Sequence, residues 1–138
     1  MARRFYPDTS VWRDYFEDRK DNVRPLGEFA FRFLRKCQEN QWIILVSGEV
    51  EKELLAYYSQ KRVEEIFSNF HDIIRNVEES RRQVSEAISF SRKTKKAFPF
   101  SDILHSIIAR DNNAILVSRD RHFAEIGIVE CVLPEEVD

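Results

Sequence analysis

Residues 42–46 have the sequence Trp-Ile-Ile-Leu-Val, a continuous apolar run with the length of one β-strand. A second such run, Ala-Ile-Leu-Val-Ser, covers residues 114–118. Unbroken apolarity is typical of strands that are covered on both faces, as in a parallel sheet. The two runs therefore predict buried parallel strands, and with them an α/β fold.

Helical patterns separate these two runs. In residues 26–37, apolar side chains recur at i, i+3, i+4, i+7, i+8 and i+11, which is one face of an amphipathic helix. A short β-prone stretch at residues 4–6 ends at Pro7, where we expect a turn, and a last strand is expected at residues 129–133. The alternation of strands and helices favours a mainly parallel sheet. The remaining helices are expected at residues 48–58, 63–74, 80–97, 103–111 and 120–126, the last one ended by Gly127.

Residues 58–98 show helical patterns alone, which predicts a helical arm beside the sheet. The length of 138 residues favours one domain, spanning residues 1–138. The 22 basic and 24 acidic side chains leave a net charge of −2, which excludes a uniformly basic coat for nucleic acid but not a local basic patch. With 3 glycines and no GxxxxGK[ST] or GxGxxG motif, a loop that cradles phosphates is also excluded.

The cysteines and the first residues indicate where the protein resides. Cys37 and Cys131 lie far apart and outside any CxxC pair, as is typical of buried thiols in a reducing cytosol. The first residues lack the apolar stretch of a signal peptide, and no window approaches ~18 uninterrupted apolar residues. We therefore expect a soluble cytoplasmic protein that does not enter a membrane.

Acidic side chains recur just past the predicted strands. Asp8 follows the first strand, Asp120 follows the run at 114–118, and Asp102 opens the helix that leads into that run. Ligands of an open parallel sheet bind beyond the carboxyl ends of its strands, so these acids are expected at one edge. Each of the three also fits a purely structural role as a turn or helix-capping residue.

The helix after residues 42–46 offers two candidates for the fourth acid, Glu49 and Glu53. Glu53 lies three residues after Val50 and next to Leu54, at the border of the inward-facing stripe. Glu49 lies one turn earlier and further toward solvent. We predict that Glu53 belongs to the site and that Glu49 contributes from its outer side.

Converging carboxylates repel one another, and a divalent cation resolves that conflict. Mg²⁺ and Mn²⁺ prefer hard oxygen ligands and suit an acidic cleft with few protein ligands. The three histidines lack zinc spacing, so we interpret them as structural or surface residues, although His105 and His122 lie close in sequence to Asp102 and Asp120.

Four segments carry a resemblance to a known family: residues 8–11 (DTSV), 47–54 (SGEVEKEL), 102–109 (DILHSIIA) and 116–123 (LVSRDRHF). In order and spacing they resemble the PIN-domain ribonucleases, VapC-toxin-like and PilT N-terminus-like proteins that include the toxin halves of many prokaryotic toxin–antitoxin pairs. The resemblance covers nearly the whole chain.

This resemblance implies a Rossmann-like, three-layer α/β/α fold and a metal-dependent endoribonuclease that cleaves single-stranded RNA. The family's acidic quartet, which binds Mg²⁺ or Mn²⁺, falls on Asp8, Glu53, Asp102 and Asp120. The supporting residues are Thr9, Ser10, Ser118 and Glu49. An antitoxin protein and a second copy of the chain, forming a homodimer, are the implied partners.

Other interpretations remain open. The chain also fits a non-catalytic PIN-like module that binds RNA or protein. A phosphatase with Asp8 as nucleophile fits less well, because haloacid-dehalogenase-like enzymes carry a second Asp two residues later, where this chain has Ser10. The basic cluster that includes Arg92, Lys93, Lys95 and Lys96 is either a solvated helix face or a contact for the RNA backbone.

Overall fold

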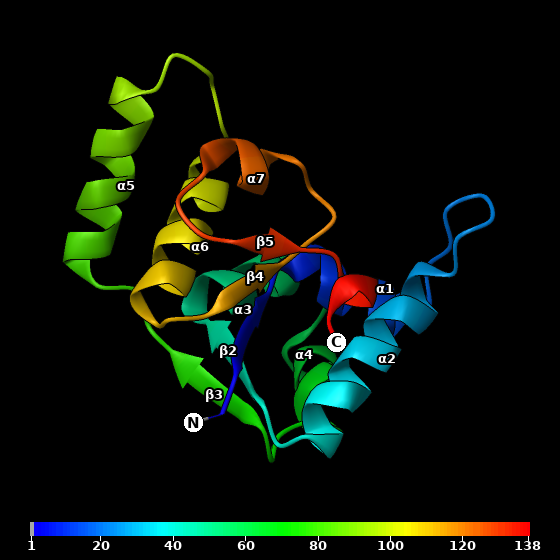
Figure 1. Ribbon diagram of the computed structural model, residues 1–138. Helices are drawn as coiled ribbons and strands as arrows, with labels where there is room; N and C mark the ends of the chain where they lie inside the picture. Colours follow the sequence, from blue (N-terminus) through cyan, green and yellow to red (C-terminus); the bar gives the residue numbers. More distant parts are fainter. Residues whose placement is uncertain (1) are drawn as a thin grey trace.

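A computed structural model describes residues 2–138 and contains a five-stranded sheet (Figure 1). The strand order is β3-β2-β1-β4-β5, and each neighbouring pair is parallel. The strands are β1 (Arg4–Pro7), β2 (Ile43–Ser47), β3 (Ile74–Val77), β4 (Ile115–Val117) and β5 (Cys131–Val132). The parallel sheet predicted from the two apolar runs is confirmed, and both runs lie in its interior as β2 and β4.

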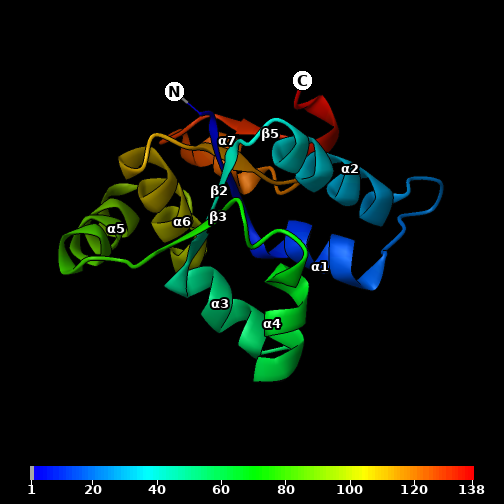
Figure 2. The ribbon, with the colours of Figure 1, turned by 90° about the horizontal axis from the view of Figure 1, so that it is seen from below.

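Helices cover the sheet on both faces (Figure 2). One side carries α1, α2 and α4, and the other carries α6 with α5 packed outside it. This arrangement confirms the Rossmann-like, three-layer α/β/α fold. The helices are α1 (Thr9–Glu17), α2 (Leu26–Glu39), α3 (Gly48–Leu55), α4 (Gln60–Ser68), α5 (Arg81–Lys93), α6 (Phe100–Asp111) and α7 (His122–Ile126), followed by a 3₁₀ turn, Pro134–Glu136. Within residues 2–138, each helix is too short or too polar to cross a bilayer.

The prediction that residues 58–98 are wholly helical is wrong, because they contain the edge strand β3. Helix α4 ends at Ser68, and Phe70 and Ile73 are buried in the turn that follows, so they continue the helical spacing by coincidence. In β3 itself only the outer residues, Ile74 and Val77, are partly buried, which gives a four-residue edge strand little periodicity to detect. The helical arm is therefore α5, which ends at Lys93 rather than at residue 97.

The turn predicted after the first strand is instead the start of α1, with Asp8 as its N-cap. Pro7 is the last residue of the central strand β1. A proline is tolerated there because the strand ends at this residue and needs no further N–H donor. The next amide, that of Asp8, donates to the carbonyl of Val117 at 3.0 Å. Asp8 therefore leaves the sheet at a fixed point beside the end of β4.

Helices α1 and α2 meet at Gly27, and the contact leaves no room for a side chain. An ideal Cβ on Gly27 would lie 2.5 Å from the Cα of Asp18 and 2.7 Å from the carbonyl oxygen of Asp14. Because both neighbours are backbone atoms, the helices would have to move apart. The close contact fixes α1, and with it the segment that begins at Asp8.

We expect Gly27→Ala to lower the free energy of unfolding by about 1–3 kcal/mol, the usual cost of overpacking. Urea denaturation followed by circular dichroism measures this loss. Gly48→Ala is the matched control, because its Cβ would meet only the flexible carboxylate of Glu79, at 3.0 Å. Equal stability of the two variants would contradict the proposed close packing at Gly27.

Candidate functional site

The carboxyl ends of β1 and β4 lie side by side at the point where the strand order of the sheet changes direction. The connections from β1 to β2 and from β3 to β4 cover opposite faces of the sheet, which leaves a crevice between β1 and β4. Pro7 pairs with Val117 in this register, so the next residues, Asp8 and Ser118, are neighbours at the edge. The crevice is therefore the place to look for a ligand site.

Asp8 directly follows β1 at this edge and is only 7% exposed. Its Oδ1 accepts hydrogen bonds from the amide of Val11 at 3.2 Å and from the hydroxyl of Ser10 at 2.7 Å. Its Oδ2 accepts from the hydroxyl of Ser118 at 2.7 Å. Burial raises the pKa of Asp8 above its ordinary value although these hydrogen bonds favour the charged form. Within residues 2–138, no Lys or Arg forms an ion pair with it.

Two further acids and a histidine continue the site from Ser118. The Ser118 hydroxyl accepts from the amide of Asp120 at 2.9 Å. Asp102 lies in the first turn of α6, and the Nδ1 atom of His122 is 3.3 Å from an oxygen of Asp102 and 3.3 Å from one of Asp120. One donor atom from each of these three side chains lies within 4.8 Å of the others. Two carboxylates and an imidazole at this spacing fit a divalent cation.

The electrostatics of Asp102 agree with this cluster. Burial raises its pKa, and the negative charge of Asp120 raises it further. His122 was expected to be structural or a surface residue, but it contacts both acids. In the sequence, the position of His122 two residues after Asp120 already suggests this contact.

Glu53 lies on α3 across the crevice and has different partners. Its Oε1 accepts from the hydroxyl of Thr9 at 2.7 Å and lies 2.6 Å from Nε2 of His105. Burial alone would raise the pKa of Glu53, but the bonds from His105 and Thr9 outweigh it and hold this pKa below its ordinary value. Glu53 is therefore ionised at neutral pH.

A buried chain of polar groups holds His105 in place. Its Nδ1 lies 2.6 Å from the hydroxyl of Tyr6, which lies 2.6 Å from the hydroxyl of Ser47. Tyr6 is fully buried in β1, and burial raises the pKa of its phenol well above the ordinary value. Sequence reasoning missed this support. His105 lies three residues after Asp102 on one helix, which is a usable signal, whereas Tyr6 in an apolar strand gives none.

The structure does not bring the other sequence-predicted residues into contact with these acids. Glu49 has no side-chain hydrogen bond within residues 2–138, and its amide donates to a carboxylate oxygen of Glu79 at 2.7 Å. Lys96 pairs with Glu125 of α7 at 2.6 Å. The same loop places the ring of Phe98 6.1 Å from that of His122, so the loop borders the Asp102–Asp120 side of the site. Arg92 and Lys93 form the last turn of α5, and Lys95 follows in the loop.

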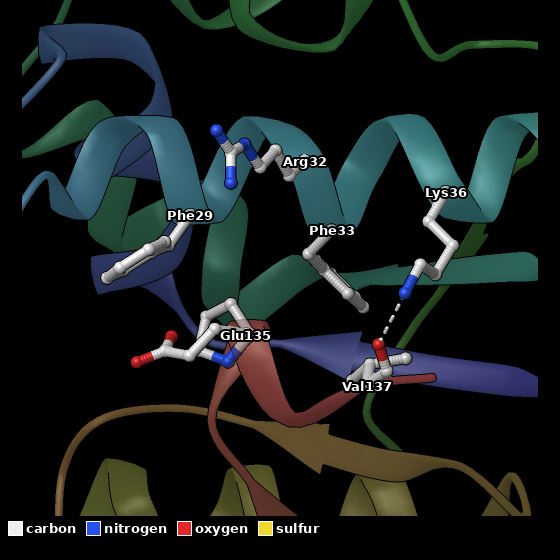
Figure 3. Close-up of a pocket in the computed structure, with 7 residues that line it drawn as sticks. Phe29, Arg32, Phe33, Lys36, Glu135 and Val137 are labelled. Carbon is white, nitrogen blue, oxygen red and sulfur yellow. Dashed lines mark hydrogen bonds between the residues drawn. The ribbon is translucent and has the colours of Figure 1, made fainter.

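Two cavities lie near these elements. One of about 320 Å³ opens between α1 and α3 and is lined by Asp8, Thr9, Ser10, Arg13, Glu53, Ala56 and Tyr57. The other, of about 270 Å³, lies between α2 and the C-terminal turn (Figure 3). Its one carboxylate, Glu135, is bound in two-pronged fashion by Arg119 at 2.6 and 2.9 Å. Glu135 thus holds Arg119, which lies between Ser118 and Asp120 in the sequence. Among residues 2–138, the second cavity therefore has no carboxylate left unpaired for a cation.

Comparisons with known proteins give the family and the fold. A family model described as PIN domain matches residues 5–129. No curated protein sequence gives a significant match.

Several solved structures share the fold. A chain of VapBC2 from Rickettsia felis, bound to a promoter DNA fragment, superposes with a TM-score of 0.69 and 16% identity, covering 93% of this chain and 96% of that one. FitAcB from Neisseria gonorrhoeae gives 0.64 and 16%, covering 96% and 99%. FitAB bound to an IR36 DNA fragment gives 0.64 and 14%, covering 97% of each chain.

We expect Asp8→Asn to raise the melting temperature in EDTA at neutral pH, because it removes a buried charge that has no cationic partner. The folded pKa of Asp8 is raised, so the native state holds the proton more tightly than the unfolded chain. The cost of the ionised form is present above the folded pKa and vanishes as the pH falls toward the unfolded value of about 3.9. The advantage of the variant should therefore shrink between neutral pH and pH ~4.

Asp14→Asn is the control for this measurement. Asp14 is also buried, but Nε of Arg19 lies 2.8 Å from its Oδ1. Loss of that charged hydrogen bond is expected to lower the free energy of unfolding by about 1.5–3 kcal/mol. An Asp8→Asn variant less stable than wild type at every pH would contradict the cost assigned to the buried charge.

Proposed function

The chain belongs to the PIN-domain family, and from this premise we propose that it is an endoribonuclease that depends on Mg²⁺ or Mn²⁺ and cleaves single-stranded RNA. One observation carries the proposal. Asp8 and Glu53 line one cavity, Ser118 links Asp8 to Asp120, and His122 contacts both Asp120 and Asp102. None of these four acids forms an ion pair with a Lys or Arg of residues 2–138. Such uncompensated negative charge is costly in the free protein and becomes favourable when a cation binds.

The carboxylates of Asp8, Asp102 and Asp120 would hold the cation, with Glu53 opposite them and His122 as a further donor. When bound, the cation supplies Lewis-acid activation of water and offsets the charge that develops on the phosphodiester. The hydroxyls of Ser10 and Ser118 fix the Asp8 carboxylate before the cation arrives. The chain Ser47–Tyr6–His105 orients Glu53, whose lowered pKa keeps it charged and able to accept a hydrogen bond from water.

The same geometry disfavours the phosphatase. Haloacid-dehalogenase-like phosphatases need a second Asp two residues after the nucleophile, and here that position is Ser10, whose hydroxyl donates to the Asp8 carboxylate at 2.7 Å. The non-catalytic binding module remains the second candidate. An acidic crevice that binds a cation and RNA but does not cleave would support it.

We also propose that residues 1–138 form one domain and that the protein is the toxin of a toxin–antitoxin pair, active as a homodimer. The support is the fold shared with VapBC2 and with FitAB, whose structures are complexes with DNA fragments. Purification with a small protein encoded beside the gene, and loss of RNA cleavage in that complex, is the expected result. Light scattering measures the oligomeric state.

The basic residues at the end of α5 are proposed to contact the RNA backbone. Lys96 is paired with Glu125, but Arg92, Lys93 and Lys95 form no ion pair within residues 2–138. Arg92 and Lys93 end α5, and Lys95 lies in the loop that follows, which also carries Phe98, whose ring is 6.1 Å from that of His122. Positive charge beside the crevice offsets the repulsion between its acids and the RNA phosphates.

Asp8→Asn and Asp120→Asn are each expected to reduce RNA cleavage in Mg²⁺ or Mn²⁺ by more than about 100-fold, since loss even of a partner of a metal ligand costs 10- to 100-fold. Cleavage of a mixture of labelled single-stranded RNAs, with EDTA as the metal-free control, measures the effect. Glu130→Gln, outside the crevice, is the control for an acid-to-amide change. Full activity in either site variant would overturn the assignment.

Glu53→Gln is expected to weaken Mn²⁺ binding by at least about 10-fold, a loss that is common when a metal site is perturbed. Glu49→Gln should bind nearly as tightly as wild type, because its side chain makes no hydrogen bond with the rest of the site. Titration calorimetry of the two variants compares the two acids directly. Loss of affinity in Glu49→Gln alone would show that the wrong turn of α3 has been chosen.

A further inference from the structure

Beside the acids, the cavity between α1 and α3 presents an aromatic ring and a cation. Tyr57, just after α3, is 60% exposed and lines the cavity together with Asp8 and Glu53. The guanidinium carbon of Arg13 lies 3.7 Å from the ring centroid. Because Arg13 covers one face of the ring, the exposed area belongs to the opposite face and the ring edge.

The contacts of Arg13 use the Nε atom of its guanidinium and leave the two terminal nitrogens available for a ligand. Its Nε donates to a carboxylate oxygen of Glu17 at 3.1 Å and also lies 3.4 Å from the hydroxyl of Tyr58, which itself donates to Glu17. These contacts use one edge of the guanidinium. The two terminal nitrogens have no hydrogen-bond partner within residues 2–138, although the side chain lines the same cavity as Asp8 and Glu53.

Arg13 and Tyr57 supply the two kinds of group that bind a nucleotide beside acidic side chains. Phosphate oxygens are repelled by carboxylates, and Arg13 is the one Lys or Arg among the described residues that line the cavity. A free guanidinium fork is a strong phosphate ligand, and an exposed ring face binds a nucleobase by stacking. The cavity volume of about 320 Å³ lies at the small end of the range for ligand sites, about 300–1,000 Å³, as expected for a single nucleotide unit.

We propose that this cavity is a nucleotide subsite for single-stranded RNA, in which one base stacks on Tyr57 and Arg13 binds the adjoining backbone phosphate. The inference rests on the proposed function and adds which residues bind the base and the phosphate of one nucleotide. It places one nucleotide of the RNA in the cavity between α1 and α3, beside Asp8 and Glu53.

The test measures binding of a fluorescein-labelled single-stranded RNA 10-mer to the full chain by anisotropy. EDTA is present, so that binding is separated from cleavage. Tyr57→Ala is expected to raise Kd by about 5- to 150-fold, the range for loss of one base–aromatic stack. Tyr57→Phe keeps the ring and should bind as wild type does. Arg13→Gln should lower the slope of log Kd against log salt by about 0.7, one phosphate contact on a single strand.

Matched controls come from α2. Arg35 makes the same i,i+4 bond, to Glu39 at 3.2 Å, and Phe31 is exposed to 42% outside the cavity. Arg35→Gln and Phe31→Ala should leave Kd and its salt slope unchanged. A series of 10-mers with one abasic position should show a single position whose loss weakens binding to wild type but not to Tyr57→Ala.

The outcomes separate this inference from the proposed function. If wild type cleaves RNA in Mn²⁺ while Tyr57→Ala and Arg13→Gln, folded by circular dichroism, keep the wild-type Kd and KM, the subsite is wrong and the nuclease stands. If wild type neither binds nor cleaves single-stranded RNA, the proposed function falls and the subsite with it. Equal losses in Tyr57→Ala and Tyr57→Phe would also overturn the stacking role.

Discussion

The carboxylate of Asp8, buried at the carboxyl end of the central strand, is the constraint on which the rest of the site depends. Burial of this charge is unfavourable, and the protein tolerates it because the amide of Val11 and the hydroxyls of Ser10 and Ser118 all donate to it. Those donors are in place because β1 and β4 are parallel neighbours and because Asp8 caps α1. The same bonds tie the loop that carries Asp120 to the end of β1.

A second polar network fixes the opposite side of the crevice and uses groups from the core itself. Tyr6 lies two residues before Asp8 in the sequence, and its hydroxyl joins Ser47 of β2 to His105 of α6. His105 then holds Glu53 on α3. The buried phenol of β1 thus connects β2 to α6 and, through His105, to α3, so that the Glu53 side chain is held in place by the core.

The charge distribution separates two tasks. The crevice concentrates carboxylates that no Lys or Arg of the described residues neutralises, which suits a divalent cation. Positive groups occur nearby: Arg13 stacks on Tyr57 in the cavity that Asp8 and Glu53 line, and Lys93 ends α5 ahead of the loop whose Phe98 ring lies 6.1 Å from that of His122. The proposed function assigns a polyanion to these positive groups and a cation to the carboxylates.

Much of the architecture is determined by the sequence alone. The apolar runs at 42–46 and 114–118 are local signals, because a strand covered on both faces must be apolar throughout. The acids just past those strands are equally local, since the ends of parallel strands meet at one edge whatever the helices do.

Edge strand β3 and the links through Tyr6, His105 and His122 were decided only by the tertiary structure. An exposed four-residue strand buries too little to leave a pattern. A buried hydroxyl or imidazole has a role only once its partners, which lie 41 to 99 residues away for Tyr6, are folded against it. Periodicity reports which side of an element faces the core, whereas hydrogen bonds between distant elements depend on how those elements pack.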